Sequence, residues 1–86
     1  MRYEQIHHDA KHIDRLIDLN LHVTKTQFMP QESLKKLVLS TFPDYYVINS
    51  GWHKTVFGNH KTDHKVVLKV SGKIRRVLRA IRRIDS

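Results

Sequence analysis

YYVINSGWHKTVFGNHKTDHKVVLKV, residues 45–70, is the segment on which the interpretation of the fold depends. Three runs in it are rich in β-branched and aromatic residues, which favour strands. They lie at 45–48, 54–57 and 65–70. Turn-forming residues separate the runs. Because connections this short join antiparallel neighbours, the segment predicts a three-stranded antiparallel meander.

Helical patterns flank the strands on both sides. Apolar residues recur every three or four positions over 4–20, and Pro30 and Pro43 bracket a second, shorter helix. After the break at Ser71-Gly72, residues 73–84 read KIRRVLRAIRRI and follow the same spacing. We therefore predict an α+β fold with two N-terminal helices, a three-stranded antiparallel sheet and a basic C-terminal helix.

Length and composition set the organisation. A chain of 86 residues makes one small domain at most. We interpret 1–29 as an N-terminal helical segment and 30–86 as a small α-β-β-β-α domain. The absence of cysteine excludes disulfides, thiolate zinc sites and a cysteine nucleophile. No apolar run is long enough for a membrane span or a secretory signal, so we expect a cytoplasmic protein.

The net charge of +8 is unevenly distributed. Residues 1–51 contain six Lys/Arg and six acids, whereas residues 52–86 contain ten Lys/Arg and two acids. A one-sided basic surface attracts polyanions, so we expect a nucleotide or nucleic acid as the partner. The alternative is a basic tail that is simply solvated.

Lys69 is the single cation in the apolar run 66–70. Val67 and Lys69 share one face of the predicted strand, and Val66, Leu68 and Val70 share the other. Since a strand with one buried face needs polar residues on the other face, Lys69 fits an outward strand position. It equally fits a phosphate-binding lysine, and the pattern leaves both interpretations open.

The order of a glycine turn, a hairpin, a third strand with lysine and a helix resembles the N-lobe of bacterial kinase-like phosphotransferases. Their glycine-rich loop reads G-x-G-x-x-G-x-V and their third strand V-A-I-K. Here Gly51 and Val56 match the loop, Asn49 and Lys54 replace two of its glycines, and VVLK at 66–69 stands for the strand motif. The resemblance covers roughly residues 42–84.

This resemblance implies ATP with Mg²⁺ as the ligand. Lys69 would pair with the α- and β-phosphates, the backbone at Gly51 would lie over the phosphates, and Val56 would touch the adenine. The family places a glutamate on the helix after the third strand, but residues 73–84 contain no acid. Phosphoryl transfer also needs a base and metal ligands. We therefore expect a truncated N-lobe module without phosphotransfer activity on its own.

The same segment also resembles the double-stranded-RNA-binding domain. Pro43 and Tyr45 enter the first strand, Gly51 and His53 precede Phe57, and a basic cluster opens the last predicted helix. This alternative predicts a module that binds duplex RNA or DNA through the C-terminal cations. They are Lys73, Arg75, Arg76, Arg79, Arg82 and Arg83.

Three further patterns bear on function. The apolar face of the predicted C-terminal helix, at Ile74, Val77, Leu78 and Ile81, offers a site for a protein partner. Trp52 either stacks on a base or packs over a small core, and the second is the commoner role. Two pairs of the seven histidines, His8/His12 and His60/His64, lie four residues apart, but a zinc site needs three or four ligands and no H-E-x-x-H motif is present, so we predict no metal.

Overall fold

The computed structural model describes residues 3–62, 66–73 and 79–82 of the chain. Two helices precede four strands, and the two predicted N-terminal helices are confirmed. The elements are α1 (Tyr3–Thr24), α2 (Gln31–Thr41), β1 (Tyr45–Ser50), β2 (Lys54–Asn59), β3 (Val66–Ser71) and β4 (Arg79–Arg82).

The strands form one antiparallel sheet in the order β1-β2-β3-β4, which confirms the predicted meander of the first three strands. In β1 and β2, Val47 lies opposite Phe57, but Asn49 lies opposite Val56. Ile48 is therefore an extra residue in β1, and this bulge re-aims the strand just before the turn at Gly51.

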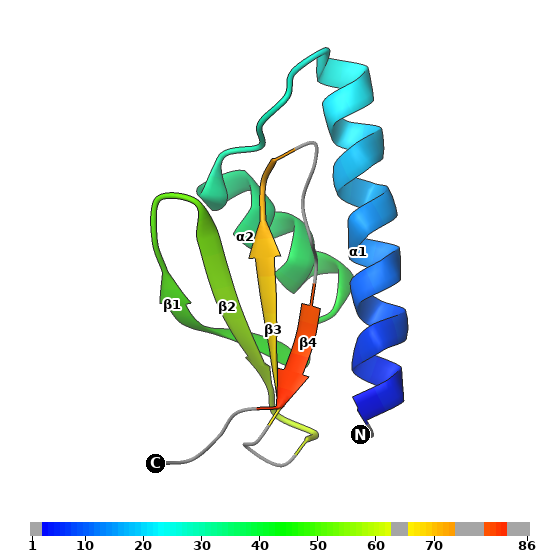
Figure 1. Cartoon of the computed structure of the whole chain (residues 1–86), viewed down its shortest axis with the longest axis vertical. Helices are drawn as coiled ribbons and strands as arrows, with labels where there is room; N and C mark the ends of the chain where they lie inside the picture. The colour runs from blue at the N-terminus through cyan, green and yellow to red at the C-terminus, as the bar shows by residue number, and fades with distance from the viewer. Residues whose placement is uncertain (1–2, 63–65, 74–78, 83–86) are drawn as a thin grey trace.

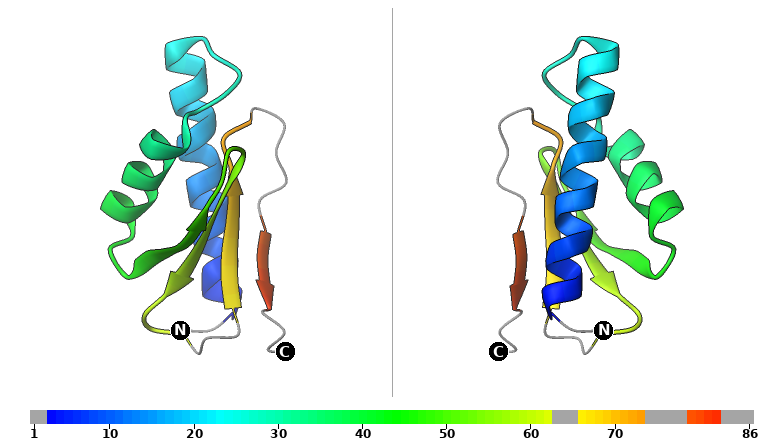
Figure 2. Two further views of the ribbon diagram at one scale, coloured as in Figure 1. Left: turned by 90° about the vertical axis from the view of Figure 1, so that its left-hand side faces the viewer. Right: turned by 90° about the vertical axis from the view of Figure 1, so that its right-hand side faces the viewer.

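Both helices cover the same face of the sheet (Figures 1 and 2). The long helix α1 packs against β3 and β4, and α2 packs against β1 and β2. The opposite face carries no covering element among the described residues and is called the open face below. In β3, burial alternates accordingly from Leu68 to Val70, where Lys69 alone is exposed, whereas Val67 is buried although its position belongs to the open face.

The core lies between the helices and the sheet. Helix α1 contributes residues at the predicted three- and four-residue spacing, and the strands contribute Tyr45, Phe57, Leu68 and Val70. From α1 come Ile6, Ala10, Ile13, Ile17 and Leu21. The N-terminal helix therefore shares its hydrophobic core with the sheet.

A hydrogen bond ties the start of α1 to the sheet. The Tyr45 hydroxyl donates to the Asp9 carboxylate at 2.8 Å. Burial raises the pKa of the Tyr45 hydroxyl, and the neighbouring Asp9 raises it further. The phenol is thus held in its protonated form, which can donate this bond.

Helix α1 runs four residues past the predicted stop at Asn20. It ends at Thr24, and the next residue, Lys25, has a φ of 56° in the left-handed region. The Lys25 N–H donates to the His22 carbonyl and the Thr26 N–H to the Leu21 carbonyl. This pair of bonds is a Schellman motif, here without the usual glycine.

The predicted C-terminal helix is wrong at Arg79–Arg82, which is strand β4. Four residues are too few for the spacing of apolar side chains to distinguish a strand from a helix, so periodicity alone does not decide. The edge of β3 has unpaired backbone groups, and β4 satisfies them along Val66–Lys69. The rest of the predicted helix, 74–78 and 83–84, lies outside the described residues.

In the described part of the chain, no helix is both long and apolar enough to cross a membrane.

Candidate functional site

The structure brings together two of the three residues that the kinase-like resemblance implies. Val56 and Lys69 are direct partners in the β2–β3 register. Gly51 lies at the tip of the β1–β2 hairpin, where its N–H donates to the Lys54 carbonyl at 2.9 Å. The Gly51 position belongs to a pocket that Lys69 does not line.

Lys69 is exposed on the open face of the sheet, as its outward strand position predicts. Lys54, also exposed, starts β2 opposite Ser71, and so stands diagonally next to Lys69. Arg79 lies directly opposite Lys69 in the β3–β4 register. Because directly opposite residues belong to one face, these three positions form a cationic band across three strands.

This band has no acidic counterpart in the sheet. The four strands, within the bounds that the structure gives them, contain Lys54, Lys69, Arg79 and Arg82 and no Asp or Glu. Four acids lie instead on α1, in the other layer: Glu4, Asp9, Asp14 and Asp18. The charge asymmetry along the sequence is thus also an asymmetry between the layers of the fold.

An aromatic side chain lies on the same open face. Gly58 is opposite Tyr46, and a Cβ added to Gly58 would come within 2.6 Å of the Tyr46 ring. The ring therefore lies across the glycine, with its centre 4.5 Å from that of His60. Tyr46 is only partly buried, so part of a π surface remains accessible on the same face of the sheet as the cations.

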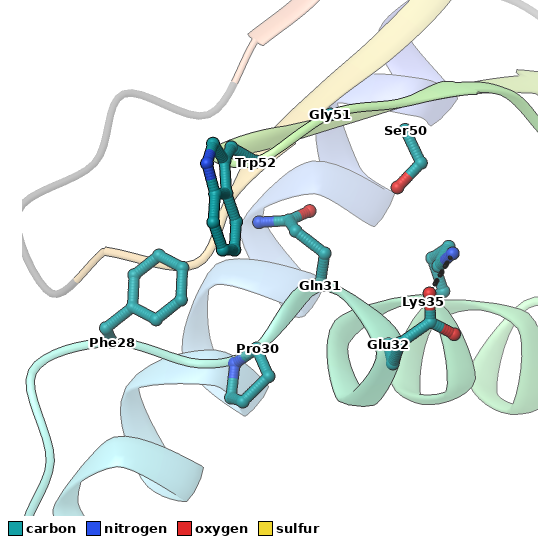
Figure 3. A pocket seen from close by; sticks show the side chains of 8 residues that line it. All are labelled: Phe28, Pro30, Gln31, Glu32, Lys35, Ser50, Gly51 and Trp52. Atoms are coloured by element: carbon teal, nitrogen blue, oxygen red, sulfur yellow. Dashed lines mark hydrogen bonds and ion pairs between the residues drawn. The ribbon is translucent and has the colours of Figure 1, made fainter.

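A pocket of about 410 Å³ opens at the tip of the hairpin (Figure 3). Its walls come from the α1–α2 connection, the start of α2 and the hairpin tip. The lining residues are Phe28, Pro30, Gln31, Glu32, Lys35, Ser50, Gly51 and Trp52. Trp52 is 88% exposed, so the expectation that it packs over a small core is wrong.

Polar contacts fix the walls of this pocket. The buried Thr55 hydroxyl donates to Gln31 Oε1 at 2.5 Å, and Ser50 Oγ lies 3.2 Å from Thr55 Oγ1. Gln31 Nε2 is buried and has no hydrogen-bond partner among the described residues. Lys35 Nζ donates to Glu32 Oε1 at 2.6 Å, and this bond lowers the pKa of the Glu32 carboxyl.

Sequence reasoning missed most of this pocket. The backbone N–H of Met29 donates to the Gly72 carbonyl at 2.8 Å, and Phe28 forms a bridge with Lys73. These contacts hold the α1–α2 connection beside the end of β3. The pattern around Pro30 predicts a helix start, but no local signal places that start beside Trp52.

Only some of the C-terminal cations that the sequence singles out lie within the described residues. Lys73 is exposed and bridges to Phe28, and Arg82 pairs with Val66 at the end of β4. Arg75, Arg76 and Arg83 lie outside the described residues, as do Ile74, Val77 and Leu78 of the predicted partner-binding face. Ile81 of that face lies opposite Val67 in β4. Across the ranges described, no three His, Cys, Asp or Glu residues gather as a metal site would require.

Comparison with protein-family models, curated proteins and solved structures finds no match to this chain.

Proposed function

We propose that this domain binds nucleic acid through the open face of its sheet. One observation supports this most directly: Lys69 is exposed, diagonal to Lys54 and directly opposite Arg79 in strands that contain no acid. Like charges directly opposite each other destabilise a sheet. A polyanion removes this cost, because each phosphate neutralises a cation and releases its own counterions.

The shape of the face supports a chain-like ligand. The cations of the band belong to three adjacent strands, and neighbouring strands lie about 4.8 Å apart. The phosphates of one nucleic-acid strand follow one another at a similar scale, about 3.4 Å along the axis of a duplex. Tyr46 adds a π surface on which a base can stack. Contacts of this kind favour the phosphate backbone over any particular sequence.

Nucleotide binding in the manner of a kinase-like N-lobe, with ATP and Mg²⁺, is the second candidate. The observation that favours it is the direct pairing of Val56 with Lys69. Two observations weigh against it. The open face bears no carboxylate in its described strands to hold Lys69, and Gly51 belongs to a pocket that Lys69 does not line. Phosphotransfer by this chain alone is not expected under either candidate.

Fluorescence anisotropy with labelled oligonucleotides separates the two candidates. Single-stranded RNA and DNA of about 12 nucleotides, and a matching duplex, are titrated with the protein. Mg-ATP is then added as a competitor. We expect dissociation constants of about 1 to 100 µM for the oligonucleotides, and we expect the affinity to fall as salt rises. Displacement by stoichiometric Mg-ATP, or no oligonucleotide binding at low salt, would overturn the proposal.

A further inference from the structure

The pocket at the hairpin tip has two chemically different ends (Figure 3). Trp52, Phe28 and Pro30 make an apolar, largely aromatic end. At the other end are the Ser50 hydroxyl and the ion pair between Lys35 and Glu32. A ligand that fits both ends is flat and apolar at one side, and carries hydroxyl or anionic groups at the other.

We propose that this pocket takes up one unpaired nucleotide of a single-stranded nucleic acid. The base stacks against Trp52 and Phe28, while the sugar and phosphate point to Glu32 and Lys35. The carboxylate accepts hydrogen bonds from ribose hydroxyls, and the ammonium group of Lys35 attracts a phosphate. A volume of about 410 Å³ lies within the range of small-molecule sites. This inference rests on the proposed function and adds a preference for single strands.

The exposure of Trp52 is the first argument. A tryptophan side chain that is 88% exposed leaves a large apolar surface in water, and Phe28 beside it is 40% exposed. Contiguous exposed apolar patches rimmed by polar residues mark interaction sites. Stacking on such a platform tolerates any base and strengthens binding by roughly 5- to 150-fold per base.

The second argument is an unmet hydrogen bond. Gln31 Nε2 has no partner, while the Thr55 hydroxyl holds Gln31 Oε1 and so fixes the amide. Buried donors without partners are rare and costly. The edge of every base carries acceptors that match this donor.

The third argument is continuity with the cationic band. Trp52 and His53 form the two-residue tip between Gly51 and Lys54, which are joined by the 2.9 Å backbone hydrogen bond. A strand that follows Lys69 and Lys54 therefore arrives at the tip. The space over Gly51 is open, since an added Cβ would meet only the Lys54 carbonyl oxygen at 3.8 Å.

Trp52 is the single tryptophan, so its fluorescence reports on this pocket alone. The probes are adenosine, a single-stranded oligonucleotide, its abasic analogue and a duplex. We expect the first two to quench Trp52, and the abasic and duplex forms to leave it unchanged. Trp52→Ala should bind the single strand roughly 5- to 150-fold more weakly while Trp52→Phe restores most of the affinity. Leu19→Ala, an exposed apolar change on α1, is the control.

The outcomes separate this inference from the proposed function. The absence of any oligonucleotide binding would overturn both proposals, even if adenosine quenches Trp52. Salt-dependent binding of oligonucleotides without quenching, equal for wild type and Trp52→Ala, keeps the open face and overturns the pocket. Equal quenching by the duplex and the single strand would also overturn it.

Discussion

Replacing Lys69 with glutamine removes one positive charge from the centre of the open face and keeps a polar side chain at that position. If Lys54, Lys69 and Arg79 each meet one phosphate, the plot of log K against log salt has a slope of about −2.1 for a single strand. Lys69→Gln leaves two contacts and a slope of about −1.4. Between about 50 and about 200 mM salt, wild-type affinity then falls roughly 18-fold and variant affinity roughly 7-fold.

The assay is an anisotropy titration with one labelled single strand at four or more salt concentrations. Lys11→Gln is the matched control, because it removes the same charge from an exposed position on α1 in the other layer. Lys69→Gln should change stability by no more than about 0.5 kcal/mol, because Lys69 is an exposed strand position and glutamine remains polar. An unchanged slope in Lys69→Gln, or an equal loss in Lys11→Gln, would refute the reasoning.

Two further predictions concern the scaffold. Gly72→Ala should lower the free energy of unfolding by about 1–3 kcal/mol, measured by urea denaturation, because the new Cβ would overlap the backbone carbonyl of Met29. At Gly51 an added Cβ meets open space, so Gly51→Ala should change the free energy of unfolding by no more than about 0.5 kcal/mol. An equal loss of stability in Gly72→Ala and Gly51→Ala would contradict this account. The pKa of Tyr45 is raised above its ordinary 10.0, so the folded state keeps a proton that the unfolded state releases. Wild-type stability should therefore fall as pH rises above about 10, less so in Tyr45→Phe, and parallel pH profiles would show that folding does not raise the pKa of Tyr45.

The strands at 45–70 could be predicted because local chemistry and tertiary structure agree there. Turn residues separate β-branched runs, and the alternation that puts Leu68 inside puts Lys69 outside. The end of α1 could not be predicted in this way. Lys25 adopts a left-handed conformation that usually belongs to glycine or asparagine, and no residue type signals it.

Strand β4 shows the limit of periodicity. Residues 79–82 continue an apolar spacing that suits a helix, but the register with Val66–Lys69 gives their backbone partners along β3. Such pairing depends on a distant strand edge, which a local window does not contain. The pocket is hidden for the same reason, since the Met29–Gly72 hydrogen bond joins segments more than forty residues apart.

The central claim is that the open face of the sheet, not the helical layer, meets nucleic acid. Amide chemical-shift mapping by two-dimensional NMR, during titration with a single-stranded oligonucleotide, tests it most directly. We predict that the shifts concentrate at Lys54, Val56 and Lys69 and at the hairpin tip, while the exposed side of α1 stays unchanged. Shifts centred on α1, or none at saturating oligonucleotide in low salt, would contradict the claim.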